Sequence, residues 1–134
     1  MKKLIVSVFI ILICLRPLYA QTVVYTDRNM YGVWNTYTKK YTYGDVNNSN
    51  IIFQFYDRYI SADDNSNSIY RIVKKTKDIY EDKYKIFGWD CYDEQNRSCS
   101  FNITRYYDPE TPDIIMIIYP KYAYVYFIAG VEKN

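Results

Sequence analysis

The amino-acid sequence predicts an all-β fold: an antiparallel up-and-down meander of eight or nine strands, closed or strongly curled into a small barrel, with a β-sandwich as the alternative. Three observations predict it. Apolar and aromatic residues alternate with polar ones along several segments, which is the period of a half-buried strand. Short turn-forming stretches separate these segments. Tyrosine, which is favoured in strands, occurs 18 times in 134 residues.

The N-terminal segment is expected to direct secretion. Two lysines precede an apolar run from Leu4 to Leu15, and the chain then reaches the small residue Ala20. This order is typical of a signal peptide, and the run is too short to span a bilayer of about 30 Å. We therefore predict a signal peptide over residues 1–20, a single β domain over residues 21–134, and a secreted or periplasmic protein that leaves the membrane after cleavage.

The remaining chain divides into regularly spaced strand patterns. We expect strands at residues 21–26, 32–43, 51–56, 59–63, 68–75, 84–92, 98–106, 113–119 and 122–129. The polar run 27–29 is expected to end the first strand, and the polar cluster 44–50 and the charged stretch 77–82 are expected to be connections. The two-residue turn Asp57-Arg58 predicts a tight hairpin with Phe53 opposite Ala62.

The stretch from Lys83 to Tyr107 contains two cysteines that fix the expected strand alignment. If Cys91 lies opposite Cys99, then Trp89 lies opposite Phe101 on the same face. Directly opposed residues in a non-hydrogen-bonded antiparallel pair have Cα atoms about 4.5 Å apart, which a disulfide can bridge. We expect a structural disulfide that also holds the loop between the strands in one conformation.

The end of the chain predicts a hairpin that is apolar on both faces. Pro120-Lys121 suits a turn between the last two expected strands. One face then carries Tyr122, Tyr124 and Tyr126 opposite isoleucines. Burial on two sides favours a closed sheet over an exposed edge. These tyrosines are expected to be core, a cavity lining or an exposed aromatic surface.

Charge and histidine content exclude several classes of function. Without residues 1–20, 14 basic residues stand against 15 acidic ones, so the domain lacks the basic surface that nucleic acid or an anionic membrane requires. The chain has no histidine, which excludes the common catalytic triads and imidazole-bound metals. The acidic loop at residues 63–67 lacks the glycine and glutamate of a calcium loop. We predict no enzyme activity, no cofactor and no metal site.

A short motif resembles a known family. Gly32-Val33-Trp34, followed by up-and-down strands, is similar to the Gly-x-Trp start of the lipocalin-like (calycin) barrels. The resemblance implies a barrel whose tryptophan packs across the floor and whose apolar interior holds a small ligand. In that family a basic residue from the last strand covers the tryptophan, whereas here Lys121 lies at the turn before it.

These observations leave three functional hypotheses. The first is a secreted, non-enzymatic binding module for a hydrophobic small molecule or a protein partner. The second is an inhibitor of secreted cysteine proteases that acts through the clamped loop, by analogy with the staphostatins, which are small barrels of similar architecture. The third is carbohydrate binding through exposed tyrosines. The candidate binding residues are Trp34, Trp89, Tyr92, Glu94, Asn96, Arg97, Tyr122, Tyr124 and Tyr126.

Overall fold

The computed structural model describes residues 20–134, so the predicted signal peptide lies outside the described residues except for Ala20. Within this range every regular element is a strand, and none is a helix that could cross a membrane. The strands are β1 (Thr22–Asn35), β2 (Lys40–Tyr43), β3 (Asn47–Phe55), β4 (Tyr59–Ala62), β5 (Ile69–Lys75), β6 (Ile79–Tyr80), β7 (Tyr84–Tyr92), β8 (Ser98–Tyr106), β9 (Ile114–Ile118) and β10 (Tyr122–Lys133).

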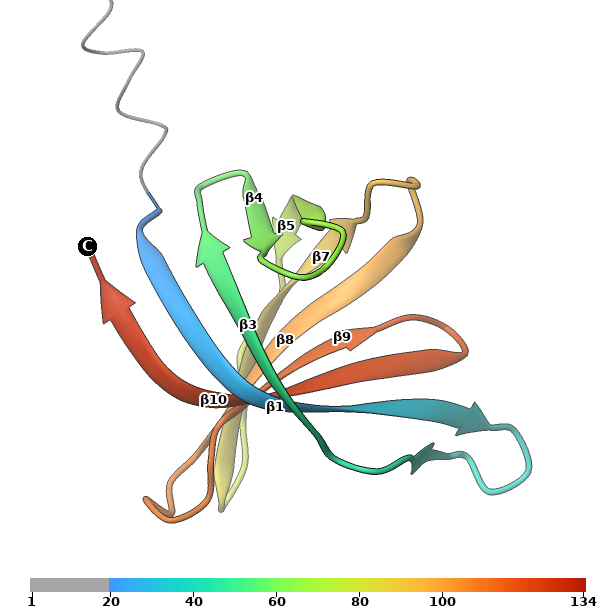
Figure 1. Ribbon diagram of the computed structural model, residues 1–134. Coiled ribbons are helices and arrows are strands. Elements are labelled where there is room, and N and C mark those ends of the chain that lie inside the picture. Colours follow the sequence, from blue (N-terminus) through green and yellow to red (C-terminus); the bar gives the residue numbers. More distant parts are fainter. Residues whose placement is uncertain (1–19) are drawn as a thin grey trace, which may run out of the picture.

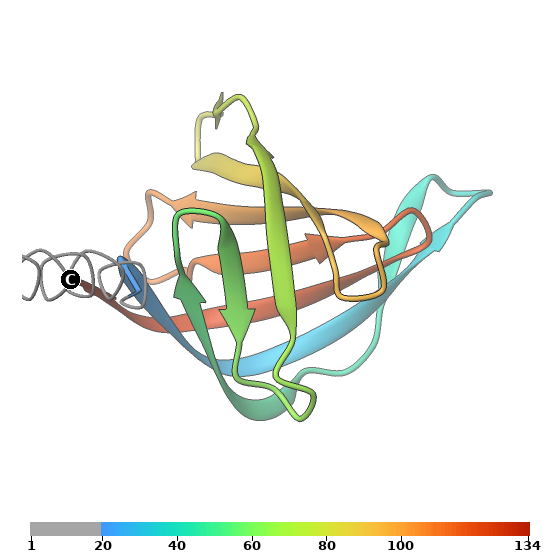
Figure 2. The same ribbon diagram turned by 90° about the horizontal axis from the view of Figure 1, so that it is seen from above.

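Eight of these strands form a closed antiparallel barrel, which confirms the predicted fold class. The order runs from β10 through β9, β8, β7, β5, β4 and β3 to β1, and β1 pairs with β10 to close the sheet. Figures 1 and 2 show β1 and β10 side by side along this closure. The other two strands lie beside the barrel, since β2 extends the far end of β1 and β6 pairs with the start of β7.

Strand β1 is longer than predicted. The polar residues 27–29 do not end it, because the alignment shifts between Thr26 and Arg28 and the strand continues to Asn35. Such a bulge bends a strand and increases its twist. Strand β1 can therefore pair with β10 along most of its length, with β3 through its first half and with β2 through its last four residues. The β1–β2 hairpin extends beyond the barrel in Figure 1.

The predicted alignments of the three hairpins are confirmed. In the β7–β8 pair, Cys91 lies opposite Cys99 and Trp89 opposite Phe101. In the β3–β4 pair, Phe53 lies opposite Ala62. The β9–β10 pair follows the predicted register as well, with Tyr126 opposite Ile115.

The predicted disulfide is wrong in this structure, since Cys91 and Cys99 are both free, buried thiols. The amide of Asp93 donates to the carbonyl of Arg97 (3.0 Å), and the amide of Tyr107 donates to that of Lys83 (3.0 Å). Asp93/Arg97 and Lys83/Tyr107 are therefore hydrogen-bonded pairs, and every second residue pair between them is one as well. Cys91 and Cys99 form one of these hydrogen-bonded pairs. Side chains stand farther apart in such a pair than in the non-hydrogen-bonded pair that we expected.

The barrel core is an aromatic and aliphatic layer near its middle. Phe53 and Phe101 are fully buried, and their rings meet edge to face with centroids 5.6 Å apart. Ile60, Ile115 and Ile117 are also fully buried. Because side chains alternate along each strand, these residues fill the interior while their neighbours in sequence face outward. The layer leaves space at both ends of the barrel.

Candidate functional site

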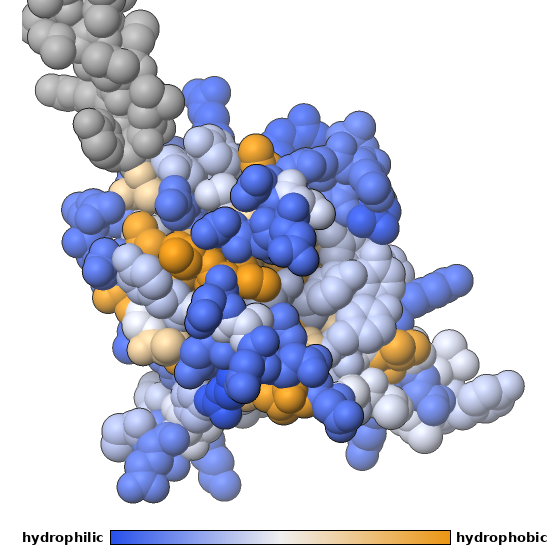
Figure 3. Space-filling view, in the orientation of Figure 1, coloured by the Kyte–Doolittle hydropathy of each residue, from blue (hydrophilic) through white to orange (hydrophobic). Residues whose placement is uncertain are grey.

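A large cavity lies at the barrel end where β1 begins and β10 ends. It has a volume of about 780 Å³. Apolar side chains from six strands line it, among them Val24, Phe55, Ile72, Phe87, Trp89, Ile103 and Ile128. Figure 3 shows apolar atoms reaching the surface over β1 and β3, between polar side chains. Cavities that hold small ligands have volumes of about 300–1,000 Å³ and mostly apolar linings, so this one has the size and character of a ligand site.

The aromatic wall of this cavity follows from the strand pattern. Phe87 and Trp89 are two residues apart on β7 and therefore project to the same side. The ring of Trp89 lies 6.2 Å from that of Phe87 and 5.5 Å from that of Phe55 on the facing strand β3. A ligand in this space would contact a continuous aromatic surface that two strands hold in place.

The mouth of the cavity carries charged side chains of both signs. The side-chain amide of Gln21 donates to the carboxylate of Asp57 (2.5 Å). The guanidinium of Arg105 lies 3.7 Å from the carboxylate of Asp113. Asp57, Arg105, Asp113 and Lys133 thus form a polar rim around an apolar interior. Such a rim keeps the entrance wetted and leaves the interior for apolar groups.

Of the two tryptophans that the sequence offered as binding residues, Trp89 lines the large cavity and Trp34 does not. Trp34 stands near the end of β1, its backbone amide donates to the carbonyl of Lys121 (2.8 Å), and its ring packs against Tyr41 with centroids 5.0 Å apart. It lies at the opposite end from the large cavity and does not line it. The expectation of a tryptophan across the barrel floor is therefore wrong, because β1 continues past the barrel before it reaches this residue.

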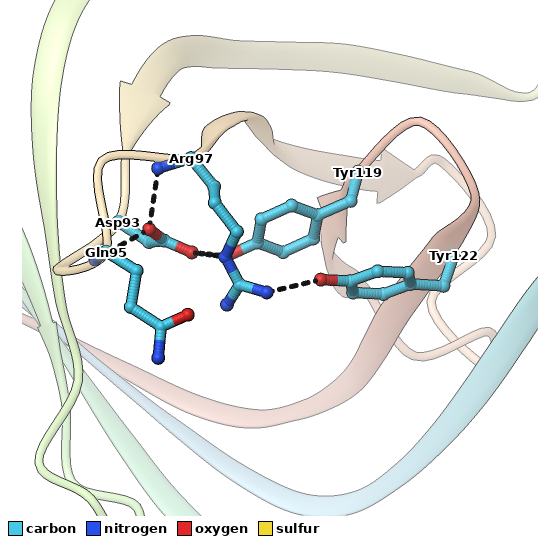
Figure 4. Close-up of polar contacts among 5 residues, drawn as sticks. All are labelled: Asp93, Gln95, Arg97, Tyr119 and Tyr122. Carbon is cyan, nitrogen blue, oxygen red and sulfur yellow. Dashed lines mark hydrogen bonds and ion pairs between the residues drawn. The ribbon is translucent and has the colours of Figure 1, made fainter.

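The predicted loop between β7 and β8 is ordered by one carboxylate. Asp93 accepts hydrogen bonds from the backbone amides of Gln95 and Arg97 (2.9 Å each) and from the Arg97 Nε (2.8 Å). The hydroxyl of Tyr119 also donates to it (2.9 Å), as Figure 4 shows. Asn96 has a left-handed backbone (φ 58°), which asparagine tolerates in turns. The hydrogen bonds of Asp93 replace the expected disulfide clamp.

The hydrogen bonds around Asp93 also shift its ionisation. Its side chain is only 9% exposed, and burial by itself raises a carboxyl pKa. The hydrogen bonds from the backbone of Arg97, from the Tyr119 hydroxyl and from the Arg97 guanidinium outweigh burial, so the pKa of Asp93 lies below its ordinary value. Asp93 is therefore a carboxylate at neutral pH.

The three candidate tyrosines of β10 occupy different environments. Tyr126 is buried in the core, where its ring lies 5.0 Å from that of Phe53. Tyr122 stacks on Tyr119 (4.8 Å) and accepts a hydrogen bond from Arg97 (3.1 Å). Tyr124 is 37% exposed. The stripe thus passes from core to surface along one strand, toward the end of the barrel opposite the large cavity.

The other loop candidates separate in the structure. Glu94 turns toward β5, where it accepts a hydrogen bond from the backbone amide of Ile69 (2.8 Å). Glu94 and Arg97 line the same small cavity as Tyr124 and Tyr126, which the sequence did not bring together. Tyr92 takes no part in that cavity and instead lies under the guanidinium of Arg71, 5.5 Å from its ring centroid.

Sequence reasoning missed most of the large cavity. Its lining includes Phe55, Ile72, Ile103 and Ile128, which were predicted as strand residues without a role. Their alternation marks them as inward-facing, but it does not distinguish a filled interior from an empty one. Comparison with protein-family models, with curated proteins and with solved structures finds no match to this chain.

Proposed function

We propose that this protein is a non-enzymatic binding module that holds a hydrophobic small molecule in the cavity beside Trp89. The volume of about 780 Å³, lined by apolar and aromatic side chains, supports this proposal most directly. Burying an apolar ligand there removes its surface from water, which stabilises binding by roughly 25 cal/mol per Å² of that surface before the cost of association. A secreted or periplasmic location remains part of the proposal.

The proposal includes no chemical step. The chain has no histidine to act as a general base. Burial and, to a smaller extent, the neighbouring thiol of Cys99 raise the pKa of Cys91 to about 12, and burial raises that of Cys99 to about 11. Both groups are therefore protonated thiols at neutral pH, which are poor nucleophiles.

Protease inhibition is less well supported than ligand binding. That hypothesis relied on a clamped loop whose side chains face a partner. Arg97 is instead paired with Asp93 and Tyr122, and Glu94 is bonded to the backbone of β5. The loop is ordered, but its charged side chains contact its own barrel.

Titration with the neutral apolar dye 1-N-phenylnaphthylamine tests the proposal. The dye is expected to become fluorescent on binding, and unlabelled long-chain alcohols are expected to displace it. Ile72→Trp places a larger side chain in the cavity and should weaken binding at least tenfold. Val73→Trp is the matched control, since Val73 is the next residue of β5 and is 55% exposed on the outside.

Two results would contradict the proposal. One is equal dye affinity in the Ile72→Trp variant and the wild type, with melting temperatures that show both are folded. The other is an absence of saturable dye binding by the wild type. Either outcome means that the cavity does not take apolar ligands.

A further inference from the structure

A second cavity lies at the other end of the barrel, with a volume of about 350 Å³. The loop between β4 and β5 forms one side of it, and the loop between β7 and β8 forms another. Four tyrosines contribute to its walls: Tyr70, Tyr119, Tyr124 and Tyr126. Phe53 and Phe101 line neither this cavity nor the apolar one and are fully buried between them. The two cavities are therefore separate sites.

The tyrosines are held rigidly around the second cavity. Tyr70 packs against Phe101 (5.6 Å) and Tyr126 against Phe53 (5.0 Å), so the core fixes both rings. The ring of Tyr119 lies 6.4 Å from that of Tyr124 and nearly perpendicular to it. The four tyrosine rings therefore line one small volume at differing angles, and the face of an aromatic ring attracts positive charge.

The carboxylates of the cavity carry more negative charge than its one basic residue balances. Asp64, Asp93, Glu94 and Arg97 are its charged residues. Arg97 forms an ion pair with Asp93 at 2.8 Å, and its guanidinium lies 5.2 Å from the ring centroid of Tyr119. Figure 4 shows how these three side chains are arranged. The remaining two carboxylates form no ion pair with a basic side chain anywhere in residues 20–134.

Those two carboxylates are held in place by neutral donors. Asp64 accepts hydrogen bonds from the backbone amides of Ser66 (3.1 Å) and Ser68 (3.0 Å) and from the Ser68 hydroxyl (2.8 Å). Glu94 accepts one from the backbone amide of Ile69 through Oε1. Hydrogen bonds from neutral groups orient a carboxylate without cancelling its charge. Asp64 and Glu94 therefore line the cavity as two carboxylates without an ion-pair partner among residues 20–134.

Tyr126 connects this cavity to the barrel core. Tyr126 is 9% exposed, packs on Phe53 and lines the cavity. Burial and, to a smaller extent, the nearby charge of Asp64 together raise the pKa of Tyr126 to about 12.

We propose that this second cavity binds a small organic ammonium ion between the tyrosine rings and the carboxylates of Asp64 and Glu94. Positive charge is attracted both to the faces of aromatic rings and to unpaired carboxylates, and the partly enclosed cavity strengthens both interactions relative to water. The volume admits an ion about the size of choline. This site is independent of the apolar cavity and does not rest on its function.

Calorimetric titration of the full chain with choline tests the proposal, with the neutral isostere 3,3-dimethyl-1-butanol as the matched ligand. The two molecules have the same shape and differ in one charge. Choline is expected to bind at least tenfold more tightly. The alcohol binding as tightly as choline, or neither binding, would overturn the proposal, as would glucose binding in place of choline.

Two variants locate the binding. Glu94→Gln keeps an oxygen that can accept from Ile69 but removes the charge, and it should weaken choline binding about tenfold. Tyr124→Leu removes a partly exposed ring and should also weaken it. Glu110→Gln removes an exposed carboxylate at the opposite barrel end and is the control, with unchanged affinity expected. Equal affinity in the Glu94→Gln variant and this control would assign the binding elsewhere and overturn the site.

Discussion

The hydroxyl of Tyr119 donates a 2.9 Å hydrogen bond to the carboxylate of Asp93, which lies 26 residues earlier in the chain. The bond ties the loop after β7 to the end of β9. Asp93 accepts three further hydrogen bonds from its own loop. One nearly buried carboxylate therefore orders the loop and attaches it to the neighbouring hairpin.

Replacing Asp93 by asparagine is expected to lower the free energy of unfolding by about 2 kcal/mol, which is the usual contribution of a hydrogen bond to a charged group. Asparagine keeps the shape but cannot accept from all four donors as a carboxylate does. Urea unfolding followed by fluorescence measures the change. Asp45→Asn is the control, because that exposed side chain forms no contact of this kind within the described chain, and it should change stability by less than about 0.5 kcal/mol.

The contribution of Asp93 should also depend on pH. Its pKa is lowered in the folded protein, so its stabilisation is fully present above the unfolded value of about 3.9 and is lost as pH falls through the folded pKa. Thermal melts from pH 7 to pH 2 should therefore show a difference between wild type and Asp93→Asn that is constant above about pH 5 and shrinks in acid. A difference that stays constant down to pH 2 would argue against this linkage.

Two glycines in strands should respond oppositely to alanine. A Cβ on Gly88 would overlap the side-chain oxygen of Asn102 and the backbone oxygen of Phe101 on β8, so Gly88→Ala should cost about 1–3 kcal/mol. A Cβ on Gly130 meets nothing within 4 Å, so Gly130→Ala should be neutral or slightly stabilising. Denaturation midpoints compare the two, and equal effects would show that the close approach at β8 is relieved by movement.

Both cysteines should behave as protected thiols. The third cysteine, Cys14, lies in the predicted signal peptide, so the experiment uses residues 21–134. An aromatic disulfide reagent at pH 8 is expected to react slowly with the folded protein and rapidly with both thiols in urea. Burial and a pKa of about 12 for Cys91 and about 11 for Cys99 are the reasons. Purified protein that yields no thiols even in urea would instead contain the bond that the sequence first suggested.

Hairpin alignments could be predicted from the sequence because each depends on a few nearby residues. The opposition of Cys91 and Cys99 and the turn at Asp57-Arg58 each fix a whole strand pair. Whether the cysteine pair is hydrogen-bonded depends on the conformation of the loop between the strands. Asp93 sets that conformation through contacts that sequence pattern does not reveal.

The candidate sites were less predictable because they depend on how the barrel closes. Trp89 was a candidate on the aligned hairpin and does line the cavity, whereas Phe101, its predicted partner across the hairpin, does not. Trp34 was assigned by a three-residue motif, whose place in the fold changed once β1 proved to be 14 residues long. Glu94 and Tyr124 line one cavity although they lie on segments that come together only when the sheet closes.

The pairing of β1 with β10 has a consequence for how the chain folds. These strands are the farthest apart in sequence among all those that pair, so their contact requires the largest loop-closure entropy. The β3–β4, β7–β8 and β9–β10 hairpins can form early from local contacts. The β1–β10 pairing, which is the seam of the barrel, can form only after both ends of the domain have been brought together. High contact order of this kind slows folding to the range of milliseconds to seconds. Until the seam closes, β1 and β10 are unpaired edges that can join another chain.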